Sequence, residues 1–176
     1  MASRAYVRKI VFAGIVGALY AALTIGMFFI SFGPLQFRIA EALTVLPFFF
    51  PFSVWGLFVG CIVANLFSPY GWIDVVGGSL ASLIAGLCTM RIGMTMRRES
   101  LAVKAFGCAP PVVFNAVVIG AIIGWAQTGG GSAFLPAFIV SGLQVGLGQL
   151  VVLYVLGLPL MHMLPKMPFF DSLSGV

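Results

Sequence analysis

A chain of 176 residues is long enough for one domain, and its composition excludes the soluble globular class. Only 7% of its residues are charged, against roughly 25% in soluble domains, and 61% are hydrophobic. The net charge of +5 does not indicate a nucleic-acid partner, because the basic residues lie between apolar segments, as they do in the loops of membrane proteins.

Six apolar segments follow one another along the chain, so we predict an all-α integral membrane protein with a six-transmembrane-helix bundle. The segments cover residues 10–30, 38–51, 53–67, 72–90, 106–127 and 134–162, the last with a bend near Pro159. The second and third are shorter than the roughly 20 residues that cross a bilayer, and they meet at Pro51. We therefore expect an irregular hairpin there, of the kind tolerated where it lines a cavity. Residues 1–176 are taken as a single membrane-embedded domain.

The basic residues give the predicted bundle an orientation. With both termini on one side, Arg38 is the only basic residue on the opposite side; the others are Arg4, Arg8, Lys9, Arg91, Arg97, Arg98, Lys104 and Lys166. Because loops rich in lysine and arginine stay in the cytoplasm, we place the N- and C-termini there.

The polar residues gather in the half of the bundle away from the basic loops. They are Arg38, Glu41 and Asp74 among the ionisable residues and Asn65, Asn115, Gln127, Gln144 and Gln149 among the amides, with Phe37 in the outer loop. Ionisable groups inside a membrane usually face a cavity, because lipid cannot solvate them. We predict that these side chains form a substrate-binding pocket for a small polar molecule.

Each of these residues also has a structural explanation. Arg38 and Glu41, three positions apart on a helix, can pair with each other, and Asp74 at a helix start can act as a cap. The amides can join neighbouring helices by hydrogen bonds. A channel, by contrast, needs polar residues across the whole bilayer, and the half near the basic loops is almost purely apolar.

Small residues form a stripe along the first segment. Gly14, Ala18, Ala22 and Gly26 recur at four-residue spacing. Such a stripe lets another helix approach closely. It can serve packing inside this bundle or contact with another subunit, and the sequence leaves both open.

Nothing in the sequence indicates catalysis or a metal site. It has no nucleotide-binding loop of the Gly-x-x-x-x-Gly-Lys type, and its one histidine, His162, stands alone. Cys61, Cys88 and Cys108 have neither disulfide nor zinc spacing. We therefore expect no enzyme activity and no cofactor, so that energy for any transport must come from ions or from a partner.

Three stretches resemble a known family. They are 36–47 (QFRIAEALTVLP), 60–65 (GCIVAN) and 74–83 (DVVGGSLASL), and Gly148–Gln149 with 157–160 (GLPL) fits as well. Over nearly its whole length the chain is similar to the QueT-type substrate-binding subunits of energy-coupling factor transporters. At the position of Gln149 that family often has a glutamate.

The resemblance implies a six-helix subunit that captures a micronutrient outside the cell. Such subunits work with a transmembrane coupling subunit and two cytoplasmic ATPases, which use the ATP, and they deliver substrate by toppling in the membrane. The implied interface with the coupling subunit is Gly14, Ala18 and Ala22.

The ligands implied by the resemblance are queuosine precursors, which are 7-deazaguanines. A guanine-like edge offers two adjacent N–H donors to a carboxylate, Glu41 or Asp74. Its carbonyl oxygen accepts from an amide, for which the candidates are Asn115, Gln127 and Gln144. A subunit for another vitamin and a stand-alone ion-coupled carrier are the alternatives.

Overall fold

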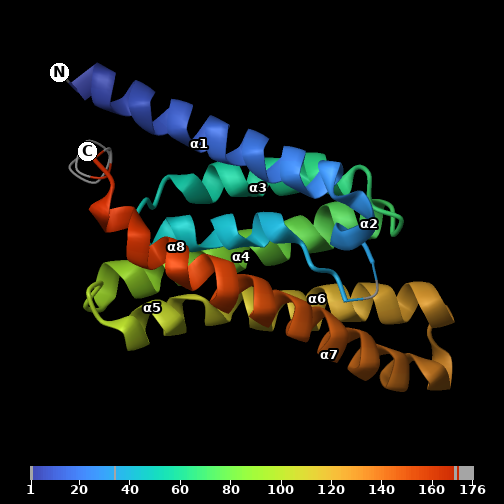
Figure 1. The fold of residues 1–176 in the computed structure, drawn as a ribbon. Coiled ribbons are helices and arrows are strands. Elements are labelled where there is room, and N and C mark those ends of the chain that lie inside the picture. The colour runs from blue at the N-terminus through green and yellow to red at the C-terminus, as the bar shows by residue number, and fades with distance from the viewer. Residues whose placement is uncertain (1, 34, 169, 171–176) are drawn as a thin grey trace.

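The computed structural model describes residues 2–33, 35–168 and 170, and every regular element in that part of the chain is a helix (Figure 1). The helices are α1 (Ala2–Gly26), α2 (Phe28–Ser31), η1 (Ile39–Phe48), α3 (Ser53–Asn65), α4 (Trp72–Thr95), α5 (Leu101–Gly107), α6 (Ala109–Thr128), η2 (Gly131–Ala133), α7 (Phe134–Val152), η3 (Leu153–Gly157), α8 (Leu158–Met163) and η4 (Leu164–Lys166).

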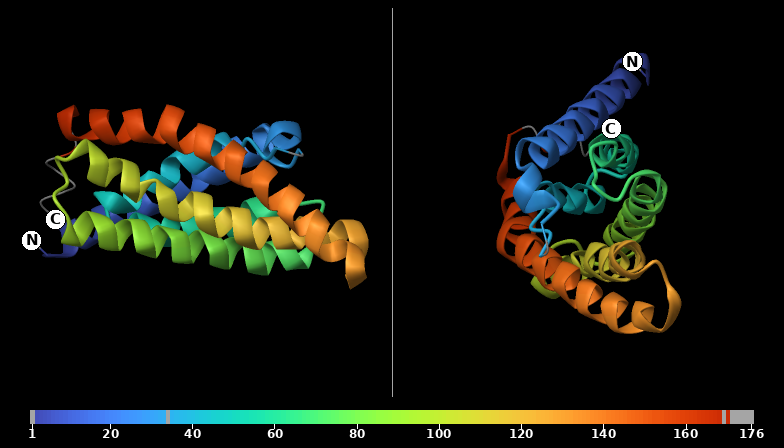
Figure 2. Two further views of the ribbon diagram at one scale, coloured as in Figure 1. Left: turned by 90° about the horizontal axis from the view of Figure 1, so that it is seen from below. Right: turned by 90° about the vertical axis from the view of Figure 1, so that its right-hand side faces the viewer.

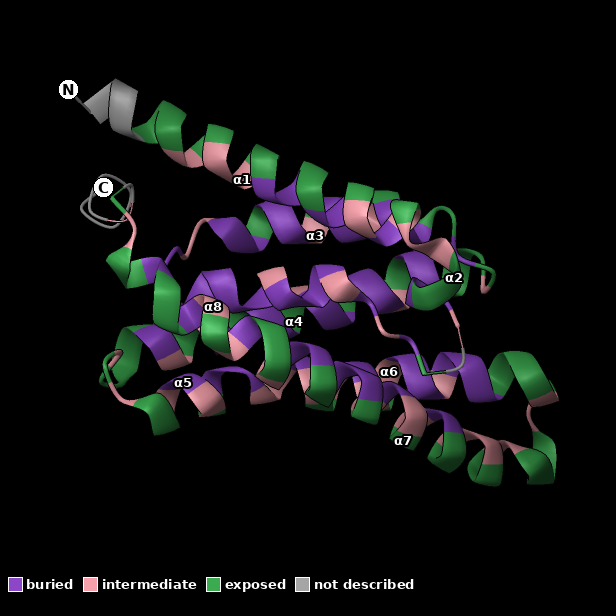
Figure 3. Cartoon of the chain, viewed as in Figure 1, coloured by how far each residue is buried: buried purple, intermediate pink, exposed green. Residues whose placement is uncertain are grey.

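Four helical stretches are long and apolar enough to cross a membrane. They are Tyr6–Gly26, Trp72–Thr95, Leu101–Thr128 and Gly131–Lys166. Large apolar side chains cover their outward faces, which are largely exposed in Figure 3; Trp72 and Leu143, for example, are 75% and 64% exposed. Water would not tolerate such a surface, whereas lipid favours it, so the fold fits an integral membrane protein.

The two remaining segments form the irregular hairpin that the sequence predicts. η1 is a 3-10 helix of 10 residues, and α3 is an α-helix of 13 residues. At rises of about 2.0 and 1.5 Å per residue, each is roughly 20 Å long, short of the ~30 Å hydrocarbon core. Most of η1 is buried, with α1, α3, α4 and η3 against it. Neighbouring protein therefore shields its non-α backbone from lipid.

Glycines bring α1 and α3 into close contact. A Cβ on Gly17 would meet the backbone of Gly56, and one on Gly60 would meet the backbone of Gly17. The end-on view in Figure 2 places α1 at one edge of the bundle and the α6–α7 pair at the other. As a result α1 is the least covered long span, with 28% of its apolar window buried against 50% for α4.

The last long span departs from a regular α-helix near the predicted bend. The five residues of η3 form a π-helix directly before α8, whose second residue is Pro159. Proline has no backbone N–H and its ring crowds the carbonyl four residues earlier, so a widened turn relieves the clash. This interruption ends at Gly157, two residues before Pro159.

One prediction about the basic loops is wrong. The basic pattern predicts that Lys104 lies in a loop before a segment that starts at residue 106, but α5 starts at Leu101 and buries Lys104. The Lys104 ammonium lies 6.0 Å from the ring centroid of Phe49. A lysine can bury its aliphatic stem in a helix while its charge meets an aromatic face, so its presence does not end the apolar segment.

The start of α1, the α4–α5 turn and η4 lie at the same end of the bundle (Figure 1). We call it the basic end, because it carries Arg91, Arg97, Arg98, Lys104 and Lys166. The opposite end carries the residues 32–38 loop and the turns at 66–71 and 129–130.

Candidate functional site

Buried polar side chains from α1, η1, α3 and α4 meet towards the opposite end. A chain of close polar contacts joins Tyr20, Arg38, Glu41, Cys61, Asn65, Ser68, Asp74, Ser79 and Ser82, which we call the polar network. Its members are separated by up to 62 positions in the sequence, from Tyr20 to Ser82. The fold, and not local sequence, therefore assembles it.

The first part of the network joins α1 to η1. The Tyr20 hydroxyl donates to Oε1 of Glu41 at 2.6 Å and accepts from Nη1 of Arg38 at 3.5 Å. Nη1 of Arg38 lies 3.9 Å from the same Glu41 oxygen, and its guanidinium lies over the Phe32 ring at 4.9 Å. Arg38 and Glu41 are thus neighbours, as their spacing allows, but they form a long and single contact.

The second part joins the end of α3 to the start of α4. The Ser68 hydroxyl donates to Oδ2 of Asp74 at 2.5 Å. The Asn65 amide donates to the backbone carbonyl of Asp74 at 3.1 Å and reaches Ser79 at 3.5 Å. The N-cap residue of α4 is Gly71, and Asp74 lies in the first turn of the helix.

Cys61 connects the two parts. Its sulfur lies 3.7 Å from the Tyr20 hydroxyl, 3.4 Å from the Asn65 amide and 3.3 Å from the Ser82 hydroxyl. Thiols are weak hydrogen-bond donors and acceptors, so these contacts contribute little to holding the helices together. Their main effect is to align the hydroxyl and amide groups around the sulfur. They place Glu41 and Asp74 in one network.

Several buried polar atoms here have no hydrogen-bond partner among the described residues. They are Nε2 of Gln36, Nε and Nη2 of Arg38, Oε2 of Glu41, Oδ1 of Asn65, Oδ1 of Asp74 and Oε1 of Gln149. An unsatisfied buried group costs about 1–3 kcal/mol, and native proteins hold few of them. These unpaired atoms, four acceptors and three donors, make the region a candidate site for a polar ligand.

The charges of the region do not cancel. In their ionised forms Arg38 contributes +1 and Glu41 and Asp74 contribute −1 each, which leaves −1 for the buried group. Partial burial, together with the Asp74 charge, raises the pKa of the Tyr70 phenol in the turn before α4, so this hydroxyl stays protonated at neutral pH. The region therefore favours a cation or a donor-rich neutral group over an anion.

Comparison with known proteins identifies the family of this chain. The model of the QueT transporter family matches residues 10–166, which include the whole polar network. The chain belongs to the QueT transporter family. It is 40% identical over 77 residues to the queuosine precursor transporter QueT of Lactococcus lactis subsp. cremoris (strain MG1363), a match that covers 43% of this chain and 45% of that relative. No solved structure matches the chain.

Membership of the QueT family confirms three predictions. The resemblance seen in the sequence is real, the protein is a multi-pass membrane protein, and it is not an enzyme, since the family is one of transporters. The chain spans less than half of the length of the relative named above, so the substrate and partners of the whole protein are taken up as proposals below.

The structure gathers most of the predicted site residues, although their role stays a prediction. Arg38, Glu41, Asn65 and Asp74 belong to the network. Asn115 and Gln149 are also buried. Asn115 lies next to the Glu41 carboxylate, whereas Gln149 follows Gly148, whose backbone packs closely against that of Leu35 and Gln36. Gln144 is half-buried on α7.

Two predicted residues lie further out. Phe37 is half-buried and lines an outer hollow of about 220 Å³ with Gln36. Gln127 is exposed near the end of α6, so the structure does not bring its amide into the buried group. The depth of Gln127 along its helix predicts a pocket residue, but its position around the helix axis turns the side chain outward.

Sequence reasoning missed Tyr20, the one aromatic member of the network. A tyrosine in the middle of an apolar helix needs a partner for its hydroxyl, and that requirement is the available indication. Cys61, Ser79 and Ser82 give no comparable indication, because small polar residues are common wherever membrane helices pack closely.

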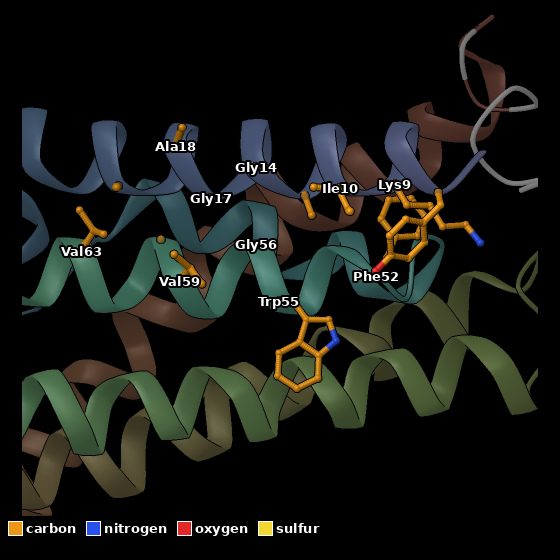
Figure 4. A pocket seen from close by; sticks show the side chains of 14 residues that line it. Lys9, Ile10, Gly14, Gly17, Ala18, Phe52, Trp55, Gly56, Val59 and Val63 are labelled. Carbon is orange, nitrogen blue, oxygen red and sulfur yellow. The ribbon is translucent and has the colours of Figure 1, made fainter. Parts of the chain in front are cut away.

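The small residues of α1, which include Gly17 and Ala21 beside the predicted stripe, lie on two faces of the helix. Gly17 and Ala21 are buried against α3, whereas Gly14, Ala18 and Ala22 are exposed. An open groove of about 790 Å³ runs between α1 and α3 and includes Gly14 and Ala18 on one wall and Trp55 and Val59 on the other (Figure 4). Gly17 accounts for the close packing of α1 against α3. The exposed residues Gly14, Ala18 and Ala22 therefore remain available for contact with another molecule.

Proposed function

We propose that this QueT-family chain is the substrate-capturing subunit of an ATP-driven energy-coupling factor importer, with a queuosine precursor as its substrate. One observation carries the proposal: buried carboxylates and amides with unpaired atoms converge at the end away from the basic loops. The family is one of transporters, and a relative that shares part of the chain is named for a queuosine precursor.

The unpaired atoms match the edge of a 7-deazaguanine. The adjacent ring and amino N–H groups of a guanine form a donor pair, which a carboxylate such as Glu41 accepts. The carbonyl oxygen of the base takes a donor from Arg38 or Asn115. A cationic aminomethyl substituent on the deaza carbon offsets the charge of −1 through the second carboxylate, Asp74.

The same chemistry provides selectivity. An adenine-type base presents an acceptor where guanine presents its ring N–H, so it leaves a buried carboxylate facing a lone pair. Each unmatched group costs about 1–3 kcal/mol, which corresponds to roughly 5- to 150-fold in affinity. A buried site with few polar groups can therefore reject a base of similar size and shape.

The proposal extends to partners and topology. The sequence has no nucleotide-binding loop, so ATP would be used by two cytoplasmic ATPases, linked to this chain by a transmembrane coupling subunit. Gly14, Ala18 and Ala22 are the proposed contact with that subunit, and the exposed face of α1 supports it. We propose six spans with both termini cytoplasmic, and delivery of the substrate by toppling of the subunit in the membrane.

The binding experiment uses purified protein in lipid nanodiscs and calorimetric titration with 7-aminomethyl-7-deazaguanine. Glu41→Gln and Asp74→Asn should each weaken binding at least about 10-fold, because each removes a charged acceptor of ligand hydrogen bonds. Glu99→Gln is the matched control, since Glu99 is an exposed acid at the basic end; its affinity should equal that of the wild type.

Unchanged affinity in both site variants would remove Glu41 and Asp74 from the site. Mass spectrometry of the compound that co-purifies with the protein separates a queuosine precursor from another vitamin. A vitamin without a guanine-type edge would contradict the proposed substrate while leaving the role as a capture subunit in place.

A further inference from the structure

The Tyr20 hydroxyl contacts both charged residues at the start of η1, Arg38 and Glu41. Its side chain is fully buried on α1, and its hydroxyl donates to one Glu41 oxygen at 2.6 Å. The one hydroxyl proton goes to Glu41 and not to Cys61, because a carboxylate at short range is a stronger acceptor than sulfur at 3.7 Å. The hydroxyl oxygen in turn faces Nη1 of Arg38 at 3.5 Å.

This arrangement keeps Arg38 and Glu41 from pairing fully. An arginine and a carboxylate usually form two parallel hydrogen bonds at about 2.7–2.9 Å. Here a single contact of 3.9 Å joins them, and Oε2 of Glu41 as well as Nε and Nη2 of Arg38 have no partner among the described residues. A phenyl ring in place of the phenol would remove the 2.6 Å hydrogen bond to Oε1, and the guanidinium could then close on both carboxylate oxygens.

We propose that Tyr20 is a positioning residue of the binding site, which holds Oε1 of Glu41 so that Oε2 stays free for the donor pair of the ligand. This inference rests on the proposed function and adds α1 to the elements that define the site. Tyr20 acts through Glu41 and needs no contact with the substrate itself.

The test is Tyr20→Phe, which removes one oxygen atom from the side chain. Affinity for 7-aminomethyl-7-deazaguanine should fall about 10-fold, whereas the weak affinity for the matching 7-deazaadenine should stay unchanged. Selectivity between the bases therefore falls by the same factor. A purely structural role would lower both affinities together. Tyr154→Phe is the control, because Tyr154 donates a single hydrogen bond to the Ala105 carbonyl; both of its affinities should match the wild type.

A second measurement needs no ligand. Tyr20→Phe and Glu41→Gln are compared singly and together by thermal unfolding, where a direct hydrogen bond makes their effects on the unfolding midpoint non-additive. Three outcomes would overturn the inference. Tyr20→Phe could bind both bases like the wild type, it could lose affinity equally for both, or the two variants could change the unfolding midpoint additively. If the wild type binds no deazaguanine, the proposed function fails, and the midpoints alone then decide whether Tyr20 holds Glu41.

Discussion

At the scale of single residues, Gly78 sets the space in which Asp74 and Asn65 lie. A Cβ at this position would lie 2.6 Å from Oδ1 of Asp74 and 2.9 Å from Nδ2 of Asn65. Both atoms belong to side chains that the polar network holds, so they would have to move. Gly78→Ala should therefore weaken binding of 7-aminomethyl-7-deazaguanine about 10-fold in calorimetric titration.

The neighbouring glycine provides the control. A Cβ on Gly77 would meet only the flexible end of Ile122, at 3.0 Å, and alanine stabilises a helix by up to about 1 kcal/mol relative to glycine. Gly77→Ala should keep wild-type affinity with an equal or higher unfolding midpoint. Equal affinities in the two variants would show that the position of Asp74 does not matter for binding.

The sequence singles out the charged members of the polar network more readily than the uncharged ones. Arg38, Glu41 and Asp74 stand out because a charge in an apolar segment is costly without a partner. Gln127 shows the limit of this reasoning, since depth in the membrane does not specify which way a side chain faces. Tyr20 shows the reverse, because an amphipathic aromatic residue is usually assigned to packing.

At the scale of elements, the sequence predicts where segments lie but not which helix they form. Hydropathy locates η1 and α3, yet it does not distinguish a 3-10 helix from an α-helix. Buried segments of either kind have a similar apolar composition. The early start of α5 has the same origin, since hydropathy does not distinguish a buried lysine from one in a loop. The π-helix before Pro159 shows the same limit, since the proline indicates an interruption of the helix but does not specify that the turn before it widens.

The proposed topology is an element-scale prediction. The loops after α3 and α6 should be extracellular and the α4–α5 turn cytoplasmic, because the basic residues cluster at the latter. In intact cells a membrane-impermeant maleimide should label cysteines placed at the exposed Pro69 and Ser132. A cysteine in place of Glu99 should react only after permeabilisation. Labelling of the Glu99 position from outside would invert the bundle and move the polar network to the cytoplasmic half.

At the scale of the whole molecule, the two ends and one edge have different tasks in the proposed transporter. The polar network lies towards one end, the basic residues other than Arg38 cluster at the other, and α1 presents an apolar edge with small side chains. A subunit that only binds its substrate needs no such edge, because lipid covers large apolar side chains equally well. The exposed small residues therefore favour a helix from another protein as their neighbour.

Adding bulk to that edge should separate capture from transport. Ala18 is exposed on α1 beside the groove, so Ala18→Leu should leave folding and ligand affinity unchanged while it holds a partner helix away. In liposomes with the coupling subunit, both ATPases and ATP, uptake of labelled 7-aminomethyl-7-deazaguanine should fall at least about 10-fold, since close helix packing tolerates no added methyl groups. Ala126→Leu, the same change on the exposed surface of α6, should transport normally. Wild-type uptake by Ala18→Leu would exclude this edge as the contact, and uptake by the chain alone would make it an ion-coupled carrier.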